Sequence, residues 1–275
     1  MFAPLAPLVA RLPRDRFPAP EDLNALVPPG ATSGGGAPLR FVPPAPPSRA
    51  FEAQYEARVF ATGEVATRPD DAHDLFNALV WMTFPATKAV FNRIHYEEMR
   101  ARRGERLRGT PRDVLTLFDE AGVIVACADR PLATLLAGHQ WKALFWTRRA
   151  EVARAMRFHV FGHAIYEKAL APYKGVTAKA LIVDVDEPFF ADPLERQLAR
   201  LDERAAAYFA DPRSLASTRI LPPLPVLGVP GWDPANGDPS YYDDASQFRP
   251  LGAPATGTRG ASARPRASSP RGGGG

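Results

Sequence analysis

The chain has 275 residues, of which 45% are hydrophobic, and a single cysteine, Cys127. This length allows one large domain or two small ones, and the lone cysteine excludes an internal disulfide and a thiolate metal cluster. No apolar stretch reaches the roughly 20 residues of a membrane span. The N-terminus lacks a basic start and is interrupted by Pro4 and Pro7, so it makes a poor signal peptide. We therefore expect a soluble cytoplasmic protein.

The net charge of +4 comes from one end of the chain. Residues 253–275 contain four arginines and no acidic residue, and the remaining chain has 30 basic and 30 acidic residues. The bias towards Gly, Ser, Pro and Arg predicts a disordered tail over residues 251–275. Such a tail binds nucleic acid or anionic lipid only weakly, so nucleic acid is not the expected partner.

Residues 1–50 contain 12 prolines and the run Ser33–Gly36. Proline at this density excludes a continuous helix or a central strand. The segment is therefore predicted to be an extended arm with at most a short helix near residues 21–26. The expected organisation is this Pro-rich arm, a single globular domain over residues 51–250, and the disordered tail over residues 251–275.

The domain is predicted to begin with two helices that meet at a proline. Asp70 or Asp71 is a suitable N-cap for a helix over residues 71–82, whose apolar residues recur at helical spacing. Pro85 suits the first turn of a second helix that runs to about Arg103.

The strongest strand predictions form a hairpin at about residues 113–127. Val114–Phe118 and Val123–Cys127 are rich in apolar residues, and the turn-forming sequence Asp119–Gly122 separates them. The remaining expected elements are a weaker hairpin over 55–67, a long helix over 131–156, a short helix over 163–170, a strand over 180–183 and a helix over 194–209. Several helices with few strands predict an α+β fold, a mostly helical single domain with a small antiparallel sheet that includes the 113–127 hairpin.

The first candidate site is formed by His73, Asp74 and Asn77 at the start of the first helix. His73 and Asn77 are four residues apart and share a helix face, with Asp74 beside them. A histidine next to a carboxylate combines a general base with the group that orients it. The alternative is helix capping, since acidic residues in a first turn pair with free N–H groups and with the helix dipole.

The second candidate is formed by His159, His163 and Glu167. If residues 158–170 form one helix, these side chains make a stripe that suits a metal ion held by two imidazoles and a carboxylate. The alternation of apolar residues over 158–162 favours a strand instead, so no metal ligand is predicted and the cofactor stays unknown. His163 and Glu167 remain paired under either interpretation, as a catalytic pair or as a satisfied structural pair.

A third stripe, Lys88, Asn92 and His95, follows the second helix and is either a binding surface or a solvated helix face. Trp232 lies in a Gly- and Pro-rich loop, where a large aromatic residue closes a pocket or packs as a plug. The predicted substrate-binding residues are Asn77, Lys88, Asn92, His95, Asp119, Arg148 and Trp232. The sequence has no dinucleotide-binding, P-loop, serine-hydrolase or zincin motif, so those classes lose their usual support.

Seven strings, in order along the chain, carry a resemblance to a known family. They are His73–Lys88, Arg112–Val125, Trp141–Arg149, Phe161–Pro172, Gly175–Leu181, Leu224–Trp232 and Tyr241–Pro250. Over residues 68–250 the chain resembles the bacterial "domain of unknown function 3025" family, and Ala72 departs from it where an aromatic residue is expected. The resemblance implies a bacterial, usually single-domain protein and no known activity.

Two classes of function follow. In the first, the chain is a small-molecule enzyme or ligand-binding protein, with His73 or His163 as the acid or base, Asp74 or Glu167 as its orienting partner, and Lys88 or Arg148 holding an anionic group. In the second, it is a non-catalytic interaction or scaffold protein whose Pro-rich arm docks a partner or straps the domain. The first class requires the ionisable groups to converge in one pocket.

Overall fold

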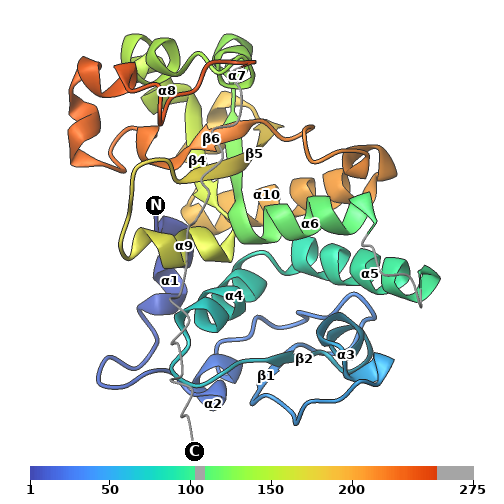
Figure 1. Ribbon diagram of the computed structural model, residues 1–275. Helices are drawn as coiled ribbons and strands as arrows, with labels where there is room; N and C mark the ends of the chain where they lie inside the picture. The colour runs from blue at the N-terminus through green and yellow to red at the C-terminus, as the bar shows by residue number, and fades with distance from the viewer. Residues whose placement is uncertain (103–108, 253–275) are drawn as a thin grey trace, which may run out of the picture.

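The computed structural model describes residues 1–102 and 109–252 and centres on a mixed sheet with the strand order β4-β3-β5-β6 (Figure 1). β3 (Gly122–Cys127) is buried along its whole length. It pairs antiparallel with β4 (Met156–Val160) and parallel with β5 (Thr177–Asp184), which pairs antiparallel with β6 (Pro223–Pro225). The α+β class and its helical character are confirmed, whereas the small sheet, predicted as antiparallel, is mixed because β3 and β5 run parallel.

The helices that position the site pack on the sheet or on one another. α6 (Thr110–Ala121) and α10 (Leu194–Ala210) pack on β3 and β5, and α5 (Pro85–Ala101) packs against both. α4 (Ala72–Thr83) lies between α5 and α9 (His163–Ala169). Apart from α6, these helices follow the predictions, and the predicted strand over 180–183 is part of β5. Residues 103–108, where α5 was expected to end, lie outside the described ranges.

The predicted hairpin at about 113–127 is wrong in its first half, because residues 110–121 form α6. The helix begins after Gly109 with Pro111 in its first turn, and its buried residues are Val114, Leu115 and Phe118. In a strand, Val114 and Phe118 would share a face with polar Thr116, whereas in a helix the three apolar residues face the sheet together. The second half of the prediction is correct and forms β3.

Two further predictions fail where the backbone turns. The long helix over 131–156 is instead α7 (Arg130–Ala137), η3 (Ala143–Thr147) and α8 (Arg149–Ala155), and it is interrupted at His139, whose φ of 54° is left-handed. The hairpin over 55–67 is instead α3 (Tyr55–Thr62) followed by β2 (Glu64–Ala66). Gly63 at φ 71° ends that helix.

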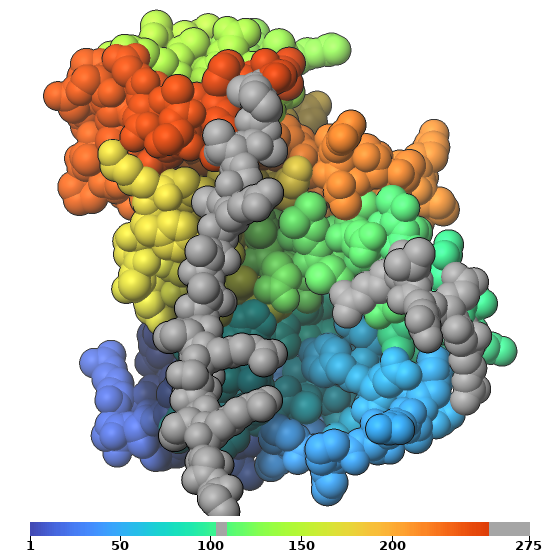
Figure 2. Space-filling model, viewed as in Figure 1, coloured from blue at the N-terminus to red at the C-terminus, as the bar shows by residue number. Residues whose placement is uncertain are grey.

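The first fifty residues pack on the rest of the chain. Leu5, Leu23 and Phe41 are 0%, 0% and 1% exposed and belong to the same core as the sheet. β1 (Arg40–Val42) pairs parallel with β2. In Figure 2 the blue N-terminal segments lie along the lower end of the molecule, and the teal surface of α4 is set back between them and the green and yellow segments.

Short elements complete the fold: η1 (Ala3–Leu5), α1 (Ala6–Val9), α2 (Pro20–Asn24), η2 (Phe51–Ala53), η4 (Glu187–Ala191), η5 (Pro212–Leu215), η6 (Val226–Gly228), η7 (Pro234–Gly237) and η8 (Pro239–Asp243). The predicted tail lies outside the described residues from 253 onward. Within the described ranges, no helix has both the length and the apolar character needed to cross a membrane.

Candidate active site

A cavity of about 580 Å³, lined by many ionisable side chains, lies where α3, α4, α5, α6 and α9 converge. Its volume falls within the roughly 300–1,000 Å³ of small-molecule sites. Of the residues singled out in the sequence, His73, Asp74, Asn77, His95, Asp119 and His163 line it. The ends of several helices therefore meet at the cavity, and they bring together side chains that lie far apart in the sequence, such as Asp74 and His163.

Aromatic packing between α4 and α9 sets the positions of the two histidines. The rings of Phe76 and Tyr166 stack with their centroids 5.6 Å apart, and the Tyr166 hydroxyl donates to the Val160 carbonyl at 2.6 Å. Because His73 and His163 stand in the first turns of these two helices, this packing directs both imidazoles towards the same point.

A close backbone approach at Gly162 places the start of α9 against the end of α6. A Cβ at Gly162 would lie 2.4 Å from the Gly122 nitrogen and 2.5 Å from the Glu120 carbonyl oxygen. Only glycine permits this approach, because real Cβ atoms do not come so near to backbone atoms. The contact brings His163, the next residue, beside the Glu120 carboxylate.

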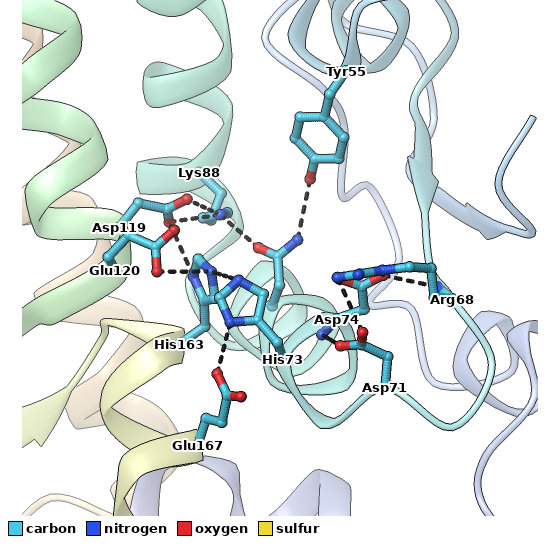
Figure 3. Close-up of polar contacts among 11 residues, drawn as sticks. Tyr55, Arg68, Asp71, His73, Asp74, Lys88, Asp119, Glu120, His163 and Glu167 are labelled. Atoms are coloured by element: carbon cyan, nitrogen blue, oxygen red, sulfur yellow. Dashed lines mark hydrogen bonds and ion pairs between the residues drawn. The ribbon is translucent and has the colours of Figure 1, made fainter. Parts of the chain in front are cut away.

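The two imidazoles meet through their Nε2 atoms, which lie 3.0 Å apart although the residues are separated by 90 positions (Figure 3). The ring planes are nearly perpendicular, at 79°. Nε2 of His163 is also 3.6 Å from Oε2 of Glu120. Burial lowers the pKa of His163 below its ordinary value, although the Asp119 carboxylate opposes this effect.

Glu167 orients His73 rather than its own-helix neighbour His163. Oε2 of Glu167 lies 2.9 Å from Nδ1 of His73. Asp74, the other predicted partner of His73, instead accepts hydrogen bonds from the backbone and side chain of Arg68 at 2.8 Å. The N-cap of α4 is Asp71, whose carboxylate accepts from the Asp74 N–H at 3.0 Å.

A chain of polar contacts leads from the histidines to the far wall of the cavity. Buried Lys88 donates to Asp119 at 2.6 and 2.8 Å and to Oδ1 of Asn77 at 2.9 Å, and Asn77 donates to the Tyr55 hydroxyl at 3.1 Å (Figure 3). Burial alone would raise the pKa of Asp119, but the Lys88 ammonium and then His163 hold it below its ordinary value. Oδ1 of Asp119 faces Nδ1 of His163 at 4.0 Å.

Glu56 on α3 forms a second carboxylate centre in the cavity wall. Asn92 stands behind it and donates to Oε2 of Glu56 at 2.8 Å and to its carbonyl at 2.9 Å. Burial raises the pKa of Glu56 to about 7, and the hydrogen bond from Asn92 opposes this rise. The stripe Lys88, Asn92 and His95 is therefore a buried face of α5 and not a solvated one.

Three predicted residues lie elsewhere. Arg148 pairs with Glu151 at 2.7 Å, and Trp232 packs edge-on against Phe158. His159 is buried on β4 and does not line the cavity. It therefore forms no helical stripe with His163 and Glu167. The strand over 156–160 explains this, because its alternation sends His159 away from the following helix start. Burial lowers the pKa of His159 to about 4.

Several cavity residues were missed from the sequence: Tyr55, Glu56, Arg68, Arg112, Thr116 and Glu120. Three of them lie on α6, which was predicted as strand and turn. A helical interpretation would have placed Arg112, Thr116 and Glu120 at four-residue spacing on one polar face. Glu56 and Tyr55 carry no such signal, since their role depends on α3 packing against α5.

The comparisons with known proteins agree with the resemblance of the sequence. The model of one family, described as "Protein of unknown function (DUF3025)", matches residues 39–252. No curated protein and no solved structure matches the chain. The chain belongs to the DUF3025 family.

Proposed function

We propose that this chain is an enzyme that acts on a small polar molecule in the cavity, and that His73, His163 and Glu120 form its reaction centre for a hydrolysis. The observation that carries the proposal is the 3.0 Å contact between the two Nε2 atoms at the cavity wall. Imidazoles and carboxylates that converge in a concave site are the groups that transfer protons or activate water in enzymes.

The composition of this group favours chemistry over a structural role. A structural polar network satisfies each of its buried members, as Asp202 does by accepting from the N–H groups of Ala86 and Thr87 at 2.8 Å. Nδ1 of His163, in the cavity wall, has no hydrogen-bond partner among the described residues, a feature shared by Nε2 of His159 outside the cavity. The carboxylates of Asp119 and Glu120 both approach the His163 ring, at 4.0 and 3.6 Å, and ionisable groups that gather in a cleft are typical of functional sites.

The cavity suits a small substrate that approaches the Nε2 atoms directly. His73 is about one-third exposed on the cavity side, while His163 behind it is almost fully buried. A water molecule held by these nitrogens and Glu120 would stand beside a substrate in the cavity. Tyr55, Asn77 and Arg68 on the neighbouring walls offer polar groups for the substrate itself.

A scaffold function has less support. In one form of that alternative the first fifty residues are a free docking segment, yet Leu5, Leu23 and Phe41 are buried in the core of the chain, which agrees only with the form in which the arm straps the domain. It also gives no reason for five helices to direct ionisable groups into one cavity.

We further propose a cytoplasmic location in a bacterial cell. The support is the family resemblance and the single cysteine, Cys127, which is buried and free. The expected partner is a small-molecule ligand, and weak contact with nucleic acid is expected only from the arginine-containing tail.

The experiment is a hydrolysis screen with chromogenic carboxylic esters, amides and phosphate esters on the full chain and two matched variants. His163→Gln changes the buried imidazole of the cavity, and His159→Gln changes an equally buried imidazole on β4; the two residues are 4% and 5% exposed. Far-UV circular dichroism checks that both variants fold.

We expect wild type to hydrolyse at least one of these substrates. The turnover of that substrate should fall at least about 100-fold in His163→Gln and stay within about twofold of wild type in His159→Gln. Equal turnover in His163→Gln and wild type would overturn the proposal, and so would equal losses in the two variants.

A further inference from the structure

We infer that His73, His163 and Glu120 bind one divalent transition-metal ion, with zinc as the best-fitting ion. The inference deepens the proposed function, on which its catalytic meaning rests, because the ion would hold the attacking water. The three donor atoms, Nε2 of each imidazole and a carboxylate oxygen of Glu120, all lie within 4.8 Å of one another (Figure 3).

The hydrogen-bond partners of the rings point to a cation between them. Nδ1 of His73 lies 2.9 Å from Glu167, so its N–H donates there and its Nε2 carries a lone pair. A proton on Nδ1 of His163 then sets two Nε2 lone pairs against each other at 3.0 Å. A proton on Nε2 instead leaves the lone pair of buried Nδ1 facing the Asp119 carboxylate. An ion that accepts both Nε2 lone pairs removes the conflict.

An additional proton shared by the two Nε2 atoms is the alternative to a metal ion. The net negative charge around the imidazoles favours a divalent ion over that proton. The carboxylates of Asp119, Glu120 and Glu167 surround the imidazoles, and Lys88 is the ammonium paired with Asp119. Three negative charges against one positive charge leave two negative charges. A protonated imidazole balances one of them, whereas a divalent ion balances both.

Two of the three donor separations fit a catalytic zinc site with an open position, and the third lies within 4.8 Å. Two ligands at the usual Zn–N distance of about 2.0–2.1 Å and a tetrahedral angle stand about 3.3 Å apart. The observed separations of 3.0 Å between the nitrogens and 3.6 Å from His163 to Glu120 bracket this value. Catalytic zinc has three protein ligands and a fourth position for water, and here that position would open into the cavity, which all three side chains line.

The second layer of carboxylates has the arrangement found around metal-bound histidines. A ligating imidazole commonly donates its other N–H to a carboxylate, which fixes its tautomer. Glu167 does this for His73, and Asp119 stands 4.0 Å from the corresponding nitrogen of His163. The sequence contains no metal-binding motif for this site, because each of the three ligands comes from a different helix.

The test is a titration of the full chain with Zn²⁺ alone, after metal has been removed with a chelator and the chelator by dialysis. Isothermal calorimetry gives the stoichiometry and affinity for wild type, His73→Gln, Glu120→Ala, Glu167→Gln and the control His159→Gln. Glu120 has a 42% exposed side chain, so its replacement leaves the fold intact.

We expect one ion per chain in wild type and His159→Gln. Affinity should fall about 10-fold or more in Glu167→Gln, and further in His73→Gln and Glu120→Ala. Equal affinity in wild type and His73→Gln, or no stoichiometric binding, would overturn the inference, and tighter binding of Mn²⁺ or Fe²⁺ by the same side chains would overturn the choice of zinc. If Zn²⁺ fails to bind while His163→Gln still abolishes turnover, the metal site falls and the proposed enzyme stands. If Zn²⁺ binds as expected while His163→Gln and His159→Gln hydrolyse the substrate at the same rate, the proposed enzyme is wrong and the metal site stands.

Discussion

Nζ of Lys88 lies 2.6 Å from Oδ1 of Asp119, in an ion pair beside the His163 ring. The Lys88 side chain is only 4% exposed and also stands over the Trp81 ring, 5.1 Å from its centroid. A buried ammonium is tolerated only when a counter-charge accompanies it, so this pair fixes the end of α6 against α4 and α5.

Lys88→Met should lower the free energy of unfolding by about 3 kcal/mol, because it leaves the Asp119 carboxylate without its partner. In an Asp119→Asn background the same replacement should cost at least about 1 kcal/mol less, since that charge is already gone. Urea unfolding of the four proteins measures this coupling. Equal costs in both backgrounds would show that the two side chains do not depend on each other.

Gly162→Ala should lower stability by about 2 kcal/mol or more, because its Cβ meets backbone atoms of Gly122 and Glu120 that cannot move aside. The displacement should also separate His163 from Glu120 and weaken Zn²⁺ binding at least about tenfold. Gly237→Ala is the control, since nothing lies within 4 Å of its added Cβ. Unfolding curves and calorimetry test both effects, and a Gly162→Ala protein as stable as the control would contradict the role of this close approach.

Glu56 should make stability fall as the pH rises. Its pKa is raised from 4.5 to about 7 in the folded chain, so between these values the folded state holds a proton that the unfolded state releases. The contribution of about 3 kcal/mol is therefore present below pH 4.5 and lost as the pH passes 7. The charged groups facing Glu56 are Lys88, Asp119 and Arg112.

The measurement is the difference in unfolding free energy between wild type and Glu56→Gln at several pH values. Glutamine does not titrate, so the difference should fall from pH 4.5 to pH 7 and stay level above. A difference that is constant across this window would mean that Glu56 has an ordinary pKa.

Local signals in the sequence were sufficient for most helices. α4 follows from the Asp71 cap and its apolar spacing, and α5 follows from Pro85 in its first turn. α6 was mistaken for a strand because five consecutive residues, Val114–Phe118, favour β-structure locally. The packing of Val114, Leu115 and Phe118 on the sheet overrides that preference, and such packing is a tertiary effect.

The candidate site was predictable by residue type but not by partnership. His73, His163, Glu167, Lys88 and Asp119 were all singled out, yet the predicted pairs were neighbours in the sequence. The structure pairs His73 with Glu167 and Lys88 with Asp119, across 94 and 31 positions. No periodicity within one helix contains that information, because it depends on how the helix starts meet.

If the group around His73 and His163 exists for chemistry, Glu120 should not stabilise the metal-free fold, and the melting temperature of metal-free Glu120→Ala measures this. Glu120 stands in the last turn of α6 beside Asp119, where the negative end of the helix dipole and the neighbouring carboxylate oppose its charge. The control is Asp202→Ala, which removes a buried carboxylate that accepts two N–H groups at the start of α5.

We expect metal-free Glu120→Ala to melt at or above the temperature of metal-free wild type, and Asp202→Ala to melt about 5 °C lower. A loss in Glu120→Ala as large as that in Asp202→Ala would contradict this expectation, because the carboxylate would then be holding the fold together.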